Sequence, residues 1–184
     1  MATYHHGDLR AVVLRTAAKM LDEEGLGSLS FREIARRAGV SHNAPYRHFP
    51  DRDSLLVALA CEGFDLLCGR LEGIAPSRVA GVFTNFALDH PALFRLMSGA
   101  TPPSGKPRIR EKSDALFATI RRALGDLGEA PYAAAAAWSF MSGLAHLMLD
   151  GSLEKDEAEA GGRARFVEAV SGTVRFVVKA QRSA

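Results

Sequence analysis

The residues best suited to chemistry in this 184-residue chain lie close together, in the stretch SHNAPYRHFP at residues 41–50. It holds two histidines, an asparagine, a tyrosine and an arginine, while only Ala44 and Phe49 are available as apolar anchors. Imidazole, amide, phenol and guanidinium groups donate hydrogen bonds to phosphate oxygens and to base edges. The composition therefore indicates a nucleic-acid contact, against the plainer alternative of a solvated surface helix.

The residues just before this stretch predict a short helix. Ser30 suits an N-cap, and Glu33 can return a hydrogen bond to the Ser30 amide, which together would make a capping box. The helix should begin at Phe31 and end at Gly39, because glycine readily adopts the left-handed conformation that closes a helix.

A second helix is expected from His42 to Phe49. Ser41 is its N-cap, and Pro45 lies in the first turn, where a missing amide matters least. Pro50 stops the helix because it disfavours helical backbone in the preceding residue. Two short helices joined by a tight turn are the helix-turn-helix arrangement.

The supporting element is a helix that precedes this pair. Apolar residues recur at helical spacing from Leu9 to Leu21, and Gly25 should end the helix. A long helix with an apolar stripe should follow, from the Asp51 cap to about Glu72, and connect this region to the rest of the chain. His5 and His6 with Asp8 suggest a metal site, but contact with a nucleic-acid backbone or plain disorder of this terminus is the preferred interpretation. No metal or cofactor is expected anywhere in the chain.

The charge distribution agrees with this interpretation. The formal net charge is +2. Residues 1–52 contain eight Lys or Arg against six Asp or Glu, and residues 53–184 contain fifteen of each. The excess thus falls where nucleic acid should bind, and it predicts modest, salt-dependent nonspecific affinity.

The stretch from Tyr4 to Leu56 resembles the DNA-binding region of TetR-type transcriptional regulators. The features that carry the resemblance are YHHGDLR at residues 4–10, FREIARRAGVS at residues 31–41, YRHF at residues 46–49 and DRDSLL at residues 51–56. The resemblance implies an all-α homodimer that reads a pseudo-palindromic operator in double-stranded DNA. It also implies a repressor that a small-molecule effector releases.

The resemblance also implies roles for single residues. Base contacts are expected from His42, Asn43, Arg47 and Arg32. Phosphate contacts are expected from Ser30, Ser41, Tyr46, His48 and Arg52, where the family commonly has a lysine at the position of Arg52. Ala44 completes the predicted DNA-binding set.

The remainder of the chain reads as helices without any strand pattern. They are expected at residues 78–89, in a short segment after Pro91, at residues 110–124, at residues 131–151 and at residues 163–180. Residues 73–77 and 101–107 read as linkers, and the acidic segment 152–162 as an exposed one. Cys61 and Cys68 are too far apart on one helix for a disulfide and are expected to be buried apolar residues.

Large apolar or aromatic residues are spread over five of these helices. If the helices converge, their centre is apolar and adaptable, as small-molecule pockets are, whereas an ordinary core is the alternative. The stretch AWSFMSGLAHLMLDG at residues 137–151 also resembles a Trp-His-Gly segment of one TetR subgroup, with Ser142 at the histidine position. The predicted ligand-binding residues are Phe83, Phe86, Phe94, Met97, Phe117, Trp138, Met141, Ser142 and His146.

The last two long helices predict a dimer. Residues 133–137 are all alanine and permit close backbone approach, and the final helix is valine-rich around much of its girth. A terminal helix that is apolar all round must be covered on both sides, as a four-helix interface between two copies would do.

The sequence thus predicts an all-α protein with two domains. Residues 1–52 would form a three-helix DNA-binding head, and residues 53–184 a helical ligand-binding and dimerisation domain. No membrane span is expected, because His146 interrupts the longest apolar run, and the absence of a signal-peptide pattern favours the cytoplasm. The alternative is a helical carrier or enzyme acting on an apolar small molecule, yet no recognised catalytic spacing supports an enzyme.

Overall fold

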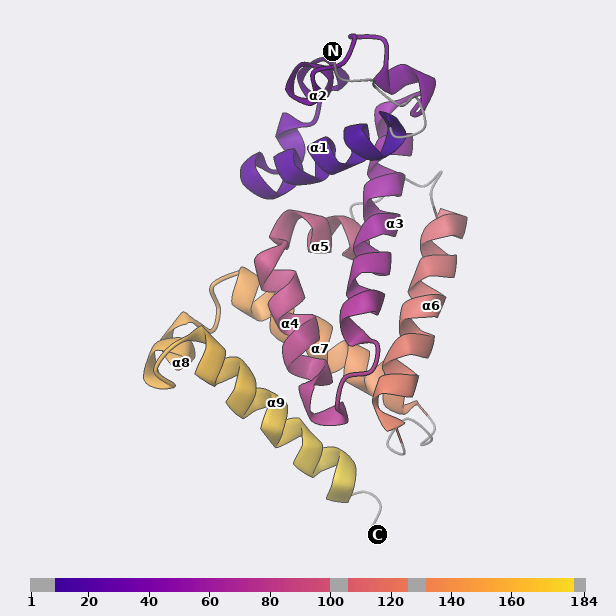
Figure 1. Ribbon diagram of the computed structural model, residues 1–184. Coiled ribbons are helices and arrows are strands. Elements are labelled where there is room, and N and C mark those ends of the chain that lie inside the picture. Colours follow the sequence, from indigo (N-terminus) through magenta and orange to yellow (C-terminus); the bar gives the residue numbers. More distant parts are fainter. Residues whose placement is uncertain (1–8, 100–105, 126–131, 181–184) are drawn as a thin grey trace. The chain divides into compact units, whose positions relative to one another are not determined.

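The computed structural model describes residues 9–99, 106–125 and 132–180, and for residues 106 and 173–180 only the backbone. Within these ranges the structure is helical and holds no strand. Helix α3 (Arg52–Leu71) is a single unbroken element of 20 residues, roughly 30 Å long (Figure 1). Predictions that concern residues 1–8, among them His5 and His6, fall outside the described residues, as does Pro131.

The chain divides into two compact units. Unit 1 comprises residues 1–64 and 90–112, and unit 2 comprises residues 65–89 and 113–184. The compact units do not test the functional boundary predicted at residue 52, which stays a prediction. Unit 1 includes the first part of α3 and all of helix α5 (Pro91–Ser98).

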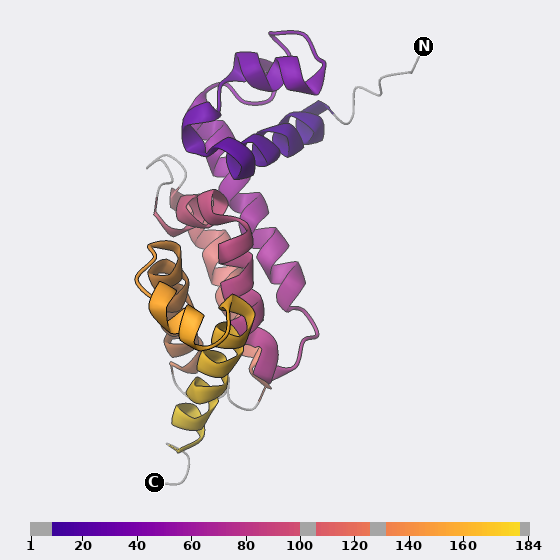
Figure 2. The same cartoon turned by 90° about the vertical axis from the view of Figure 1, so that its left-hand side faces the viewer.

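In unit 1, helix α1 (Leu9–Glu24) packs against helix α2 (Phe31–Ala38) and against α5 (Figure 2). The expected termini of α2 are confirmed, because the Ser30 Oγ accepts a hydrogen bond from the Glu33 amide and Gly39 adopts φ 66°. The short 3-10 helix η1 (Leu26–Ser28) connects α1 to α2. The core beneath these helices contains the fully buried residues Leu14, Leu21, Ile34, Leu55, Leu59 and Leu96.

Two contacts hold α5 in unit 1. A Cβ added to Gly63 of α3 would lie 2.6 Å from the Met97 Sδ and 3.1 Å from Leu93, so the two helices approach each other closely there. The Nδ1 of His90, just before α5, lies 2.9 Å from the Asp22 carboxylate near the end of α1.

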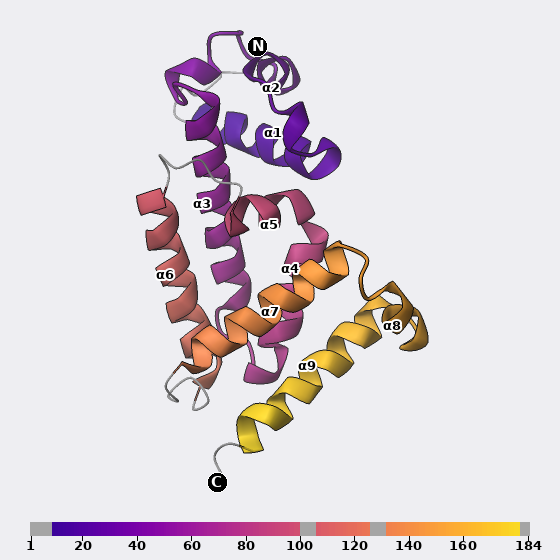
Figure 3. The same ribbon diagram turned by 180° about the vertical axis from the view of Figure 1, so that it is seen from behind.

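Unit 2 contains the end of α3 and helices α4 (Val79–Asp89), α6 (Lys106–Ala123, from Ser113 onward), α7 (Ala133–Leu149) and α9 (Arg163–Ala180). Helix α4 contacts both α7 and α9, and Figure 3 shows α7 crossing α4. The aromatic side chains of Phe83 and Phe86 are fully buried. A second cluster joins Leu88, Leu144, Met148 and Val167 from α4, α7 and α9.

Several sequence-based boundaries need correction. Helix α6 begins at Lys106 and not at residue 110, since Pro107 lies in the first turn, where its missing amide costs little. The segment 152–162 contains helix α8 (Glu154–Glu159), whose first-turn carboxylates suit the positive end of the helix dipole. The predicted linker ends in a 3-10 helix, η3 (Pro76–Arg78).

The cysteine prediction holds for one residue of the two. Neither cysteine forms a disulfide within the described residues; Cys61 is buried, and Cys68 is only half-buried. None of the helices, within the described residues, is long and apolar enough to cross a bilayer.

The start of α3 allows a stability test. The Ser54 amide donates to the Asp51 Oδ1 at 2.7 Å, and the Asp51 amide donates to the Ser54 Oγ at 3.3 Å, so both orphan amides are satisfied. We expect Asp51→Ala to lower the free energy of unfolding by about 1 kcal/mol, the usual effect of removing an N-cap. Urea denaturation at fixed protein concentration measures this, with Asp53→Ala as the control. Equal effects of the two substitutions would contradict the capping role.

Candidate DNA-binding surface

The polar segment 41–49 does not form the expected α-helix. It contains turns and one 3-10 helix, η2 (Pro45–Arg47), so the prediction of a helix from His42 to Phe49 is wrong. The reason lies in Pro45, which has no amide to donate to the Ser41 carbonyl. That carbonyl accepts from the Ala44 amide at 2.9 Å instead, which winds the chain more tightly.

Three apolar residues fasten this segment to unit 1. Ala44, Pro45 and Phe49 are buried, with Ala44 only 5% exposed. Ala44 therefore differs from the rest of the predicted DNA-binding set: its side chain serves as an anchor and has little surface to offer a ligand. The phenol ring of Tyr46 meets the buried Phe31 ring edge to face, at 4.6 Å between centroids.

The other predicted contact residues all reach solvent. Tyr46 is 49% exposed despite its contact with Phe31, and its ring lies 6.4 Å from that of His42. The remaining exposed residues of the set are Ser30, Arg32, Ser41, His42, Asn43, Arg47, His48 and Arg52. Local structure thus presents these groups outward from α2, from the 41–49 segment and from the first residue of α3.

The arginines of this surface fall into two groups. Arg36 and Arg37 are held within the protein: the Arg36 Nη2 and the Arg37 Nε lie 2.6 and 2.7 Å from the same Glu33 oxygen. In the part of the chain that the structure describes, no hydrogen bond or ion pair engages the side chain of Arg32 or Arg47. These two guanidinium groups are therefore free to meet an external anion or a base edge.

Arg37 also ties α2 to the end of α1. Its Nη2 lies 2.5 Å from the Glu24 carboxylate, and its Nη1 lies 3.8 Å from that of Glu23. A guanidinium group has five N–H donors in a fixed plane, so one arginine can satisfy several carboxylates at once. This network orients α2 on α1.

Glu33 completes only half of the predicted capping box. Its amide donates to the Ser30 Oγ at 3.3 Å, but its carboxylate is hydrogen bonded to Arg36 and Arg37 rather than to the Ser30 amide. These hydrogen bonds, to Arg36 first and then to Arg37, lower the pKa of Glu33 from its ordinary 4.5 to about 2.

Arg52 has a structural role that the sequence did not reveal. Its Nη2 donates to the Leu26 carbonyl at 2.8 Å, and its Nε lies 3.4 Å from the Leu29 carbonyl. The side chain thereby joins the start of α3 to the residues just before α2. Donors beyond these two remain on the guanidinium group, so a phosphate contact stays compatible with this arrangement.

Sequence reasoning also missed Arg10 of α1. Its guanidinium carbon lies 5.3 Å from the centroid of the Phe49 ring, as in a cation–π contact. The only signal was its place in the YHHGDLR motif, because a contact across 39 residues leaves no trace in helical periodicity.

The predicted ligand-binding residues come together only in part. In unit 2 the Phe117 ring stacks on the Trp138 ring at 4.1 Å between centroids, and the Phe83 ring lies 6.4 Å from that of Trp138. Phe86 and Met141 are buried in the same unit. Phe94 and Met97 belong to unit 1, where Met97 packs on Gly63.

His146 does not join the aromatic group. It is exposed on α7, and its Nδ1 lies 2.7 Å from the Ser142 carbonyl one turn earlier in the same helix. A local contact with the helix backbone therefore accounts for part of the pairing capacity of this imidazole.

A capped α2, a tight turn and an exposed polar segment above buried anchors resemble a helix-turn-helix DNA-binding region in which turns and a 3-10 helix take the place of the second α-helix. The family "Bacterial regulatory proteins, tetR family" matches residues 13–59, and the family "Tetracyclin repressor-like, C-terminal domain" matches residues 77–174. The chain belongs to the TetR family of transcriptional regulators. Members of this family are regulators and not enzymes, which excludes the alternative that this chain is an enzyme.

Similar proteins include two solved structures and one curated protein. A protein of unknown function from Rhodococcus sp. RHA1 is 35% identical, with 94% of this chain and 96% of that one covered at a TM-score of 0.73. A TetR transcriptional regulator from the same organism, 23% identical, shares the fold with a TM-score of 0.61 over 91% of this chain and 97% of its own. The nucleoid occlusion factor SlmA of Vibrio vulnificus (strain YJ016) is 28% identical over 67% of this chain and 68% of its own length.

The lowered pKa of Glu33 generates a pH prediction. A carboxylate with a lowered pKa contributes stability that is complete above its unfolded-state pKa of about 4.5 and is lost as the pH falls through about 2. We expect the chain to be more stable than Glu33→Gln at neutral pH, and the difference to shrink as the pH falls below about 4.5. Urea denaturation across this range measures the difference.

The control for this experiment is Glu72→Gln. Glu72 is exposed and, among the described residues, its side chain has no ion-pair partner. Its substitution should have little effect at any pH. If the difference for Glu33→Gln did not change with pH, the ion pairs with Arg36 and Arg37 would not be the source of its stability.

Proposed function

We propose that this protein is a ligand-responsive repressor that binds a pseudo-palindromic operator as a homodimer and leaves it when a small molecule binds the C-terminal part. The observation that carries the proposal is the exposed segment 41–49, whose polar side chains stand outward on three buried anchors. Such a regulator would act in the cytoplasm, where chromosomal DNA is accessible.

The DNA contacts follow from the type and exposure of each side chain. Arg47 and Arg32 would donate to guanine, and Asn43 and His42 would pair with base edges in the major groove. The hydroxyl, imidazole and guanidinium groups around them would fix the register of the protein on the sugar–phosphate backbone. These backbone contacts are assigned to Ser30, Ser41, Tyr46, His48 and Arg52.

The aromatic group of Phe83, Phe117 and Trp138 is the proposed centre of the effector site. Aromatic rings supply a large apolar area that a small organic molecule can displace or join. Met141 and Phe86 would extend this surface, and Ser142 would add a polar contact. The assignments of Phe94, Met97 and His146 are less direct, because the first two lie in unit 1 and the last is exposed.

The signal from effector to DNA would pass along α3. This helix is continuous. It begins at Arg52, whose side chain binds the Leu26 carbonyl of η1 in unit 1, and its residues from Asp65 onward belong to unit 2. An effector that binds one arrangement of the long helices better than another shifts the equilibrium by that difference in affinity, and a few kcal/mol suffice.

The dimer would form through α7 and α9. Small exposed residues recur every three or four positions along one side of α7, and Leu147 on the same side is 48% exposed. Small side chains allow a partner helix to approach closely, and an exposed leucine gains from being covered. The exposed small residues on this side of α7 are Ala136, Ser139 and Gly143.

The DNA-binding proposal is tested with Arg47→Ala. We expect a loss of about 1–3 kcal/mol in operator affinity, as for other base-contacting arginines. Fluorescence anisotropy with DNA from upstream of the gene measures the affinity across a salt titration. Arg36→Ala is the matched control, because Glu33 already holds Arg36, and this variant should bind nearly as well as the unmodified chain. If Arg47→Ala and Arg36→Ala bound the operator with the same affinity, and random DNA with the same affinity, the assignment of Arg47 would be refuted.

The dimer proposal is tested with Leu147→Glu. We expect this substitution to shift the protein towards monomer, because burying a carboxylate in an apolar interface is costly. Leu66→Glu on α3 is the control, since Leu66 is 45% exposed and lies outside the proposed interface. Sedimentation equilibrium distinguishes the outcomes. A Leu147→Glu variant that remains as dimeric as the control would exclude this face.

A further inference from the structure

Arg10, in the first turn of α1, is an exposed basic residue that the proposed DNA contacts leave unassigned. Its guanidinium carbon lies 5.3 Å from the centroid of the Phe49 ring. Figures 1 and 3 both show the first turn of α1 beside the start of α3, which follows Phe49 closely in the chain. Arg10 therefore lies at the edge of the segment 41–49, next to the side chains proposed to touch DNA.

Packing accounts for the stem of Arg10 but not for its charge. Phe49 is only 2% exposed, so the Arg10 side chain closes over a ring that the core already buries. An unbranched apolar side chain of similar length would also cover this ring. The contact with Phe49 thus explains the length and direction of the Arg10 side chain and leaves its N–H donors without a purpose.

The five N–H donors of Arg10 lack an acceptor atom. In the part of the chain that the structure describes, no hydrogen bond or ion pair engages this side chain, and a ring offers it no lone pair. Arg36 and Arg37 differ, because Glu33 holds both of them. A guanidinium group with free donors in one plane matches the paired oxygens of a phosphate.

The charge of Arg10 is also uncompensated along its own helix. The first turn of α1 holds no acidic residue, and the carboxylates of this helix, those of Asp22, Glu23 and Glu24, lie in its last turn. The rise from Arg10 to Asp22 is roughly 18 Å. At physiological salt the Debye length is about 8 Å, so these carboxylates are largely screened from Arg10.

We infer that Arg10 binds a phosphate of the DNA backbone and that Phe49 holds its guanidinium group ready for this contact. The inference rests on the proposed function and adds to it a contact from α1, outside the segment 41–49. An arginine loses rotamer freedom when it binds, and a side chain that already lies on a ring has less to lose. Phosphate contacts carry no sequence information, so Arg10 would fix the register of the protein on DNA without selecting the operator.

Arg10→Met separates the contact with DNA from the contact with the ring. Methionine keeps an unbranched apolar side chain for Phe49 and removes the charge and the donors. Fluorescence anisotropy is measured across a salt titration with two duplexes, one from upstream of the gene and one of scrambled sequence. We expect the slope of log affinity against log salt to decrease in magnitude by about one for each bound copy of the chain. Both duplexes should lose affinity by the same factor, roughly tenfold per bound copy at about 0.1 M salt.

Arg10→Lys tests whether the charge is the cause. It keeps one positive charge on a flexible stem and loses the planar set of donors, so it should keep the salt slope and lose only part of the affinity. Arg10→Gln, which also removes the charge, gives the same test as Arg10→Met should that variant not fold. Circular dichroism shows whether each variant is folded before affinities are compared.

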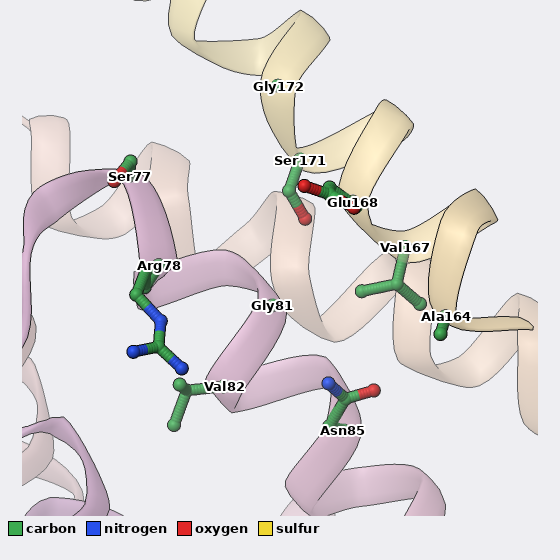
Figure 4. Close-up of a pocket in the computed structure, with 10 residues that line it drawn as sticks. All are labelled: Ser77, Arg78, Gly81, Val82, Asn85, Ala164, Val167, Glu168, Ser171 and Gly172. Carbon is green, nitrogen blue, oxygen red and sulfur yellow. The ribbon is translucent and has the colours of Figure 1, made fainter.

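Arg78→Ala is the matched control for the loss of one positive charge. Arg78 is exposed, and among the described residues its side chain has no hydrogen bond or ion pair. It belongs to unit 2, where it lines a groove between α4 and α9, and Figure 4 shows its guanidinium group beside Val82 of α4. This variant should keep both the salt slope and the affinity of the unmodified chain.

The possible outcomes separate this inference from the proposed function. If Arg10→Met kept the salt slope of the unmodified chain, or if Arg10→Lys lost as much of the slope as Arg10→Met, the inference alone would fail. A loss of affinity for the upstream duplex but not for the scrambled one would make Arg10 a contact to bases and overturn its assignment to phosphate. If the unmodified chain bound neither duplex, both the inference and the proposed function would fail.

Discussion

The burial of three side chains, Ala44, Pro45 and Phe49, is the constraint on which the candidate DNA-binding surface depends. Every other residue from Ser41 to His48 is exposed and polar, so these anchors, with the Tyr46 ring that meets Phe31, fasten the segment to the core. Fully burying a phenylalanine contributes about 1.5–3 kcal/mol, and the Arg10 guanidinium covers the outer face of that ring. These few buried side chains therefore hold the polar surface in a fixed orientation.

The remaining supports of this surface are electrostatic and lie at its edges. Arg37 joins α2 to Glu24 of α1, and Arg52 joins α3 to the residues before α2. In each case a long side chain crosses between elements and ends on a carboxylate or a carbonyl group. The helices of unit 1 are thus held by a small apolar core and by arginines.

Local signals explain what the sequence predicted correctly. The capping residues Ser30, Gly39 and Asp51 act on neighbouring amides or on their own backbone. The ends of α2 and the start of α3 can therefore be predicted from a few residues of sequence. The 3-10 turn at Pro45 was missed because the same proline is compatible with the first turn of an α-helix. The bonds of Arg52 to Leu26 and Leu29 join residues more than twenty positions apart, and no periodicity encodes them. The contact of Phe117 with Trp138 also needed the fold, since an apolar residue at helical spacing suits any core.

The pairing of basic residues has a consequence for how this protein searches a chromosome. Lys19, Arg36 and Arg37 are bound to carboxylates of the same unit, so their charges are largely neutralised before DNA arrives. Attraction to arbitrary DNA grows with the number of phosphates that a protein neutralises. With few uncompensated cations, we expect each encounter with a random site to be brief, and the protein to sample the genome by frequent dissociation more than by long sliding. Occupancy then depends on how well the few exposed donors match one site.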